Sequence, residues 1–392
     1  MSALLVLIFS VMSKRFVLNI CVFAVTLYLA RKWKETRISN YFTGYEVSKF
    51  ANAIDDSQNQ LLWELLFKES LYVDNNMVGD DYSSRPDVIR HYLKHGGIEG
   101  FKEREQTLIA RFSYFTSEKR RLAALPEKIR LLVVNKLKEH CPQASDVDSE
   151  SSTFQFQVLL PGQTTGLRVE ASHTVGRNDE SDWLLAAAAS SGLFRQSLIT
   201  SAKAIVFLNK WNSTTFGGSL VYYDKNEVSS KTAGNDRNSL IVLTGTHTIH
   251  GITAFRSSQV PRFLIGSPDL SMVFDPAEQV WFIRSKNSVV RTFRSESLHV
   301  TLNVDGICAL KGESVNFPAT ETVLQLLKDE MIETKGYSKE QIETLDDISL
   351  NDAIIGEYLD YPPPGRALLP FNYCLWIDAS PKLFAFLKIL CG

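Results

Sequence analysis

Seven short strand-like segments constrain the fold of this 392-residue chain more than any other feature. They are rich in Val, Ile, Leu, Phe and Tyr, and turn residues such as Pro161-Gly162 and Gly217-Gly218 separate them. The segments lie at 154–160, 166–171, 202–208, 219–223, 239–245, 251–255 and 262–266. Strands of this length and spacing favour antiparallel pairing in two facing sheets, as in a β-sandwich or jelly roll.

The region before this β-rich core has the apolar periodicity of helices. Within residues 45–150, the segments Leu61–Phe67 and Ile129–Leu137 repeat apolar positions at intervals of three and four. We expect these residues to form a helical region that supports the sheet, with the core itself spanning 151–270. The fold class predicted for the whole chain is therefore α+β, a jelly roll with flanking helices.

Residues 271–392 form a C-terminal extension of mixed pattern. A helix is predicted over Thr320–Glu333, and a second helix is expected to begin at Ser338. The apolar stretch 375–391 carries an aspartate and two lysines, and these charges argue against a membrane span there.

Residues 1–37 are predicted to be an N-terminal membrane segment. Their longer apolar run, 16–30, has fifteen residues, short of the roughly twenty that a spanning helix needs, but basic flanking side chains can extend it. A membrane anchor, a cleaved signal peptide and a buried apolar helix are the alternatives. We favour the anchor, because cleavage after Ala30 would put Tyr28 where a small residue is needed. The expected location is a single-pass membrane protein of the endoplasmic reticulum or secretory pathway, with its orientation open.

Charge and cysteine content exclude several classes of protein. With 42 Lys and Arg against 44 Asp and Glu, the net charge is -2, so nucleic acid is not an expected partner. Five cysteines without a CxxC pair indicate neither a zinc ribbon nor a disulfide framework, and the redox compartment stays open. The sequence also lacks the GxGxxG, GxxxxGK[ST], HExxH and GxSxG motifs.

An ordered series of short motifs runs through the β-rich core. It begins with Pro161-Gly-Gln ahead of His173, continues with Phe207-Leu-Asn-Lys-Trp and Gly217-Gly-Ser-Leu-Val-Tyr-Tyr-Asp, and ends with His250-Gly-Ile-Thr-Ala-Phe and Arg262. In order and spacing this series resembles the Fe(II)/2-oxoglutarate-dependent oxygenases, especially their prolyl-hydroxylase-like branch. The resemblance covers about residues 154–268 and implies a double-stranded β-helix, the jelly roll of that superfamily.

The resemblance also implies a site and an activity. His173 and His250 would bind Fe(II), and Arg262, expected at the start of a strand, would hold the distal carboxylate of 2-oxoglutarate, with Arg256 as a competing surface residue. Two imidazoles and one carboxylate on one face of iron leave open positions for a co-substrate and O2. The implied function is hydroxylation of a protein or peptide substrate, with ascorbate as an optional further cofactor.

One position departs from the family pattern. The family has His-x-Asp or His-x-Glu, whereas Val175 stands two residues after His173, and valine does not bind metal. Asp179 or, further along the loop, Asp182 would have to supply the carboxylate. Without one, a halogenase-like site or loss of activity is implied, and the alternative function is an inactive oxygenase-like fold that acts as a binding or scaffolding module.

Two further sets of histidines are alternatives to these ligands. His247 replaces His250 as a ligand if the strand register differs. His91 and His95 have helical spacing, but Gly96-Gly97 comes directly after them, so we interpret this pair as part of a surface helix.

Overall fold

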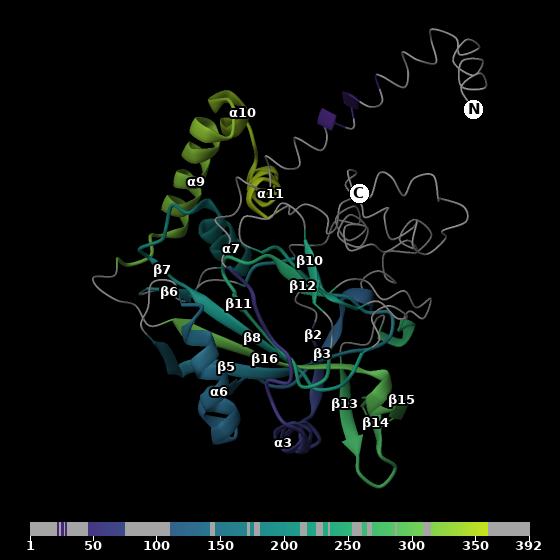
Figure 1. Cartoon of the computed structure of the whole chain (residues 1–392). Coiled ribbons are helices and arrows are strands. Elements are labelled where there is room, and N and C mark those ends of the chain that lie inside the picture. Colours follow the sequence, from purple (N-terminus) through teal and green to yellow (C-terminus); the bar gives the residue numbers. More distant parts are fainter. Residues whose placement is uncertain are drawn as a thin grey trace, which may run out of the picture.

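A computed structural model describes most of the chain (Figure 1). The described residues are 22, 25–26, 28–29, 46–74, 110–141, 146–170, 173–175, 181–211, 218–224, 230–233, 236–252, 261–264, 269–286, 288–308 and 315–359. The predicted membrane segment therefore lies outside the described residues except for five positions. None of the helices in the described ranges combines the length and the apolar character that a bilayer span requires.

Among the described residues, an eleven-stranded antiparallel sheet forms the larger layer of the fold. Its strand order is β1 (Ser48–Phe50), β11 (Leu240–Thr244), β8 (Ser201–Phe207), β16 (His299–Cys308), β5 (Val147–Leu159), β3 (Tyr114–Thr116), β2 (Leu71–Asp74), β13 (Leu270–Asp275), β14 (Val280–Ser285) and β15 (Ser288–Phe293), and β4 (Arg120–Arg121) pairs with β5. The regions before and after the predicted core thus both contribute strands to this sheet. Residues 45–150 are not purely helical, because they supply β1 to β4.

A smaller sheet faces the centre of the large one (Figure 1). It consists of β10 (Lys231–Ala233), β9 (Leu220–Tyr222) and β12 (His250–Ile252), and Arg168 bridges to His250 at the outer edge of β12. One apolar cluster joins the two layers, with Ile205 and Leu243 from the large sheet against Leu220 and Ile252 from the small one. This packing confirms the predicted pair of facing antiparallel sheets.

Helices cover the outer face of the large sheet. In Figure 1, α3 (Asp56–Leu66) and α6 (Glu127–Lys138) lie on the side opposite to β9, β10 and β12. The buried apolar residues of both helices, such as Leu62 and Val133, belong to the same cluster as Leu302 and Val304 of β16. Since strand residues alternate between the two faces, Leu302 and Val304 point toward the helices.

The same alternation turns the odd-numbered residues of β8 and β16 toward the small sheet. Ile205 of β8 lies in the cluster between the sheets, and Lys203 therefore shares its face. On β16 the odd positions Thr301, Asn303 and Asp305 are polar, although their strand neighbours are apolar. The space between the sheets thus receives polar and charged side chains at one end, and this is where the candidate site lies.

A disulfide ties the outer helix layer to the sheet. Cys141, three residues beyond the end of α6, bonds to Cys308 at the end of β16, with a Cα–Cα distance of 5.5 Å and a sequence separation of 167. The bond fastens α6 to the strand that carries Asp305. It also shows that scattered cysteines can pair without forming a framework.

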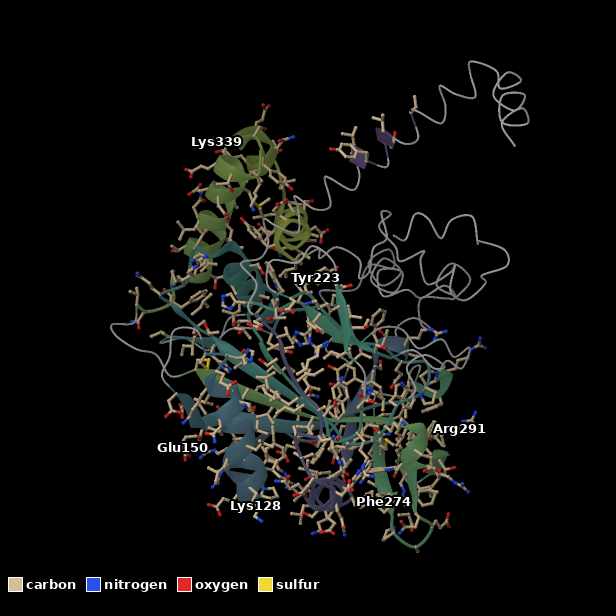
Figure 2. The ribbon with its side chains drawn as sticks, viewed as in Figure 1. Lys128, Glu150, Tyr223, Phe274, Arg291 and Lys339 are labelled. Atoms are coloured by element: carbon tan, nitrogen blue, oxygen red, sulfur yellow. A yellow bond between two sulfur atoms is a disulfide. The ribbon has the colours of Figure 1, made fainter. Side chains whose placement is uncertain are left out.

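A second apolar core lies among helices at one end of the sheets (Figures 1 and 2). It contains residues of α7 (Asp182–Ser191), α9 (Thr320–Thr334), α10 (Lys339–Glu343) and α11 (Asp347–Tyr358). The helices predicted over Thr320–Glu333 and from Ser338 are both present. Ser338 is the N-cap of α10, where its side chain and that of Gln341 form a reciprocal capping box.

Candidate functional site

The candidate site is built on a cross-strand pair between Arg168 and His250. The backbone N–H of each residue donates to the carbonyl of the other, both at 2.9 Å, so their side chains leave the sheet on the same face. Glu170, two residues after Arg168, shares that face. Gly251 permits the close approach, because a Cβ at this position would lie 2.6 Å from the carbonyl oxygen of Gly166.

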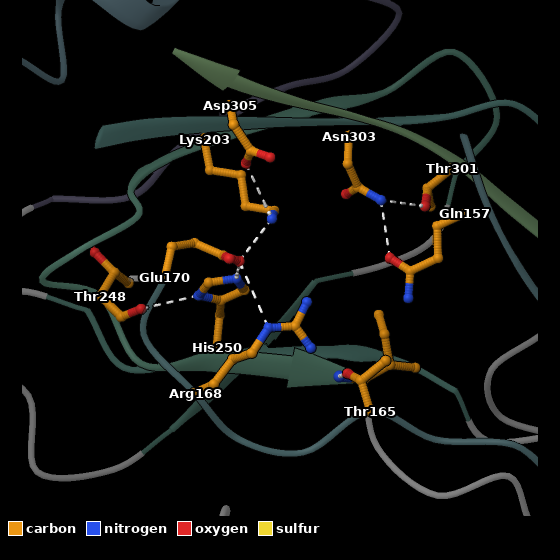
Figure 3. Close-up of polar contacts among 11 residues, drawn as sticks. Gln157, Thr165, Arg168, Glu170, Lys203, Thr248, His250, Thr301, Asn303 and Asp305 are labelled. Carbon is orange, nitrogen blue, oxygen red and sulfur yellow. Dashed lines mark hydrogen bonds and ion pairs between the residues drawn. The ribbon is translucent and has the colours of Figure 1, made fainter. Parts of the chain in front are cut away.

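One carboxylate oxygen is the centre of a charged cluster (Figure 3). Glu170 Oε1 lies 2.6 Å from Lys203 Nζ, 3.0 Å from His250 Nε2 and 3.6 Å from Arg168 Nε. Lys203 Nζ is also 3.2 Å from Asp305 Oδ1, so the ammonium bridges two carboxylates. The cluster therefore links both sheets through side chains of β8, β12, β16 and the segment that pairs with β12.

Both ring nitrogens of His250 have partners within the chain. Its Nδ1 is 2.9 Å from the carbonyl oxygen of Thr248, which can only accept a hydrogen bond. Its Nε2 faces the carboxylate of Glu170, which also accepts when ionised. Both ring nitrogens of His250 therefore face oxygen atoms of this chain.

Lys203 and Glu170 remain charged although protein surrounds them. Burial alone raises the pKa of Glu170, but Lys203, Arg168 and the hydrogen bond from His250 outweigh burial and hold that pKa well below its usual range. Burial lowers the pKa of Lys203, but the carboxylates of Asp305 and Glu170 more than compensate and raise it. The Lys203 side chain is only 5% exposed, so its charge depends on these two acids.

Neutral polar side chains lie next to the charged cluster, in the interior between the sheets. Asn303 Nδ2 donates to Gln157 Oε1 at 2.8 Å and lies 3.3 Å from Thr301 Oγ1 (Figure 3). The amide nitrogen Nε2 of Gln157 is buried and has no hydrogen-bond acceptor among the described residues. The polar part of the interior therefore extends from the charged cluster to Asn303 and Gln157.

The two predicted iron ligands lie in different sheets. His173 belongs to β6 (His173–Thr174), which pairs with β7 (Leu198–Ile199) in a separate two-stranded sheet, and it is exposed. Both ring nitrogens of the buried His250 face Thr248 and Glu170 instead. The residue paired with His250 is Arg168, five positions before His173, so these contacts do not support the predicted shared iron site.

The two aspartates proposed as replacement ligands stay untested. Asp179 lies outside the described residues. Asp182 begins α7, and its side chain also lies outside the described part of the chain.

Arg262 does not begin a strand, so this part of its prediction is wrong. It begins a 3-10 turn, Arg262–Leu264, and its side chain is exposed, whereas the sequence pattern predicts a strand at 262–266. The physical reason is Pro261, whose carbonyl accepts the N–H of Leu264 at 3.0 Å and closes the turn. Its competitor Arg256 lies outside the described residues.

Of the alternative histidine ligands, the structure describes only His247, and its ring contacts a neighbouring hydroxyl. The His247 ring is held by Thr246 Oγ1 at 2.9 Å, and burial, together with Arg195, lowers its pKa to about 4. His91 and His95 lie outside the described residues. Within the described part of the chain, no three His, Cys, Asp or Glu side chains converge in a way that would hold a metal ion.

A motif with the correct spacing occurs five residues before His173-Thr-Val. Arg168-Val169-Glu170 has a carboxylate at the third position, as in His-x-Glu, but an arginine at the first. The resemblance to the family points to neither Glu170 nor Lys203 as a site residue. A lysine in the apolar run Ala202–Phe207 is the visible signal, because a buried strand rarely carries an unpaired charge.

Fe(II) does not fit the residues that are present. The described cluster offers one imidazole, His250, and two carboxylates, Glu170 and Asp305, and all three already have partners: His250 and Glu170 contact each other, and Asp305 contacts Lys203. The Lys203 ammonium and the Arg168 guanidinium converge on the same carboxylate oxygen. A divalent ion placed there would be repelled by both cations, and the cluster has no second imidazole to replace them.

Comparisons with known proteins find similar solved structures but no sequence match. The sequence matches no protein-family model and no curated protein. Among solved structures, the chain is similar to a Pseudomonas putida prolyl-4-hydroxylase, with 11% identity, a TM-score of 0.29, and coverage of 68% of this chain and 94% of that one. It is also similar to an oxidoreductase of the 2OG-Fe(II) oxygenase family from Burkholderia pseudomallei, with 9% identity, a TM-score of 0.34, and coverage of 69% and 88%.

A third similar structure is a prolyl hydroxylase from Trichoplax adhaerens in complex with a peptide fragment of the hypoxia inducible factor oxygen degradation domain. It shows 10% identity, a TM-score of 0.30, and coverage of 72% of this chain and 92% of that one. The solved structures to which this chain is similar thus include 2-oxoglutarate oxygenases, prolyl hydroxylases among them. At these identities and TM-scores the likeness says nothing about chemistry, which depends on the strand pairing and side-chain contacts of this chain itself.

Proposed function

We propose that this chain is a metal-independent binding or scaffolding module with an oxygenase-like fold. The observation that supports this most strongly is Glu170 Oε1, which accepts hydrogen bonds from both Lys203 and His250. A ligand carboxylate of an iron centre would have to give up both contacts. Since the chain satisfies this carboxylate with its own cations, the fold does not need a metal to be complete.

The competing proposal is an Fe(II)/2-oxoglutarate-dependent hydroxylase of a protein or peptide. It is testable by measuring the conversion of 2-oxoglutarate to succinate with Fe(II) and ascorbate, on the wild type and on His250→Ala. Our proposal predicts no iron-dependent succinate from either protein. Iron-dependent succinate from the wild type that disappears in His250→Ala would overturn it.

The partner that we propose for this module is an extended acidic peptide that pairs with β15. Among the strands in the described part of the chain, this one is the last of the large sheet, and five of its six residues are exposed, including Val289 and Val290. An open edge offers unpaired backbone N–H and C=O groups to an added strand.

The charge around β15 supports an acidic partner. Residues 280–297 carry four exposed cations and a single carboxylate, and none of the four cations forms an ion pair within the described residues; they are Arg284, Lys286, Arg291 and Arg294. Figure 2 shows Arg291 at this edge. These cations would repel a strand rich in Lys or Arg and attract a strand rich in Glu or Asp.

A labelled alternating Glu-Val peptide tests this surface by fluorescence anisotropy. We expect saturable binding that weakens about tenfold or more in Arg291→Glu/Arg294→Glu, because charge reversal at a docking edge replaces attraction by repulsion. Lys339→Glu on α10 is the matched control and should bind like the wild type. Binding of anionic vesicles without binding of the peptide, or equal binding of a Lys-Val peptide, would contradict the proposal.

We also propose that the protein resides in the secretory pathway. The Cys141–Cys308 disulfide supports this location, because such bonds persist in oxidising compartments. Thiol alkylation of the protein in intact cells, with mass spectrometry of the product, is the test. Recovery of both cysteines in the alkylated, reduced form would contradict this location.

A further inference from the structure

In the charged cluster, positions 168, 170 and 250 are arranged like the ligand positions of a metal centre, but cations of the chain take the place of a ligand and of the metal ion. Positions 168 and 250 are cross-strand partners, and position 170 is two residues along the same face. All three side chains therefore point to one spot between the sheets. Glu170 and His250 are already metal-ligand types, and only Arg168 is not.

The Lys203 ammonium lies where the ion of such a centre would sit. It approaches Glu170 at 2.6 Å and Asp305 at 3.2 Å, and its side chain is almost fully buried. It comes from β8 of the facing sheet, so it reaches the three positions from the opposite side. It thereby supplies a positive charge at the point where carboxylate and imidazole converge.

We propose that Lys203 is a built-in substitute for a metal ion and Arg168 a substitute for the second imidazole. Replacing both residues, Arg168→His and Lys203→Met, should therefore create a divalent-metal site. This inference rests on the proposed metal-independent function. The variant Arg168→His/Lys203→Met would contain His-x-Glu opposite His250, with two imidazoles and one carboxylate. Methionine keeps the length of lysine and removes its charge.

Both substitutions are needed for a metal to bind. Arg168→His alone leaves the ammonium on the Glu170 carboxylate, and Lys203→Met alone leaves the guanidinium and only one imidazole. The two cross-strand positions are neighbours on one face, so their imidazoles can share one ion. First-row divalent metals bind such His and carboxylate ligands through the neutral imidazole and the ionised carboxylate.

Cobalt(II) is the probe, because bound Co(II) gives visible ligand-field absorption whether or not the protein has any activity. The wild type, both single variants and the double variant are titrated, together with the double variant carrying His250→Ala. We expect one Co(II) per chain in the double variant only, with at least about 10–100-fold weaker binding once His250 is removed. Bound Co(II) should also raise the Tm of the double variant.

Folding is checked by circular dichroism and size-exclusion chromatography. If the double variant does not fold, Arg168→His/Lys203→Gln replaces it, because glutamine still donates a hydrogen bond to the carboxylates. A folded variant without Co(II) binding overturns the inference, and so does failure of both variants to fold with and without Co(II). Wild type that binds Co(II) as tightly as the double variant would instead overturn the proposed function.

Discussion

Lys203 Nζ lies 2.6 Å from Glu170 Oε1, and this contact joins the two sheets at the end of their shared interior. The same oxygen accepts from His250. Because Lys203 is buried, its removal leaves Glu170 and Asp305 without their principal counter-charge. The contact therefore has consequences for stability as well as for metal binding.

Lys203→Met should lower the free energy of unfolding by about 3–5 kcal/mol, because breaking a buried charge network leaves the remaining charges without a partner. Urea denaturation at neutral pH measures the change. Lys339→Met is the matched control, because Lys339 is 76% exposed and its contact with Glu343 lies at the surface. The control should change stability by less than about 0.5 kcal/mol. Equal small effects of both substitutions would contradict a structural role for Lys203.

Glu170 should make the protein acid-sensitive. Its pKa in the folded state is held well below the unfolded value, so its contribution is fully present above the unfolded pKa and is lost as pH falls through the folded one. Glu170→Gln should therefore be less stable than the wild type at neutral pH, and the difference should shrink as the pH is lowered. A difference that stays constant down to acid pH would be inconsistent with this linkage.

His299 should destabilise the fold at mildly acidic pH. It is buried between Phe207 and Trp211, and burial lowers its pKa from 6.5 to about 4. The unfolded chain binds a proton that the folded chain does not, so stability is lost as pH falls below about 6.5, by roughly 2 kcal/mol at pH 5. His299→Phe should reduce the loss of stability between pH 7 and pH 5, measured by urea denaturation. An unchanged slope would show that His299 does not cause it.

The Cys141–Cys308 bond should contribute strongly to stability, because it closes a long loop. Cys141→Ser/Cys308→Ser should lower the free energy of unfolding by roughly 3–5 kcal/mol if loop-closure entropy dominates. A reducing agent should weaken the wild type to the same extent and leave the double variant unchanged. Unaltered stability of the wild type after complete reduction of this bond would contradict the prediction.

The two facing sheets are predictable because their strands have a local signature. The runs around 202–208 and 239–245 are continuous and apolar, and both contain fully buried strands, β8 and β11. The strands outside the predicted core are not recognisable in the same way, since β1 to β4 are short and β13 to β15 lie far along the chain. Their pairing depends on contacts between distant segments, which local periodicity does not contain.

The candidate site is only partly predictable. His250 is on a strand that faces the interior, as the sequence pattern indicates, but the residue opposite it is Arg168 and not His173. A one-residue difference in register changes the face of a strand, and the sequence alone does not define which segment lies opposite. The role of Lys203 becomes clear only when β8 is seen to face β12 across the interior.

The most direct test of a metal-independent site is the iron content of the wild-type protein after anaerobic reconstitution with Fe(II) and 2-oxoglutarate and removal of unbound metal. The Lys203–Glu170–His250 cluster predicts no stoichiometric iron and no rise in Tm with either ligand. One tightly bound iron per chain, lost in His250→Ala, would contradict this assignment.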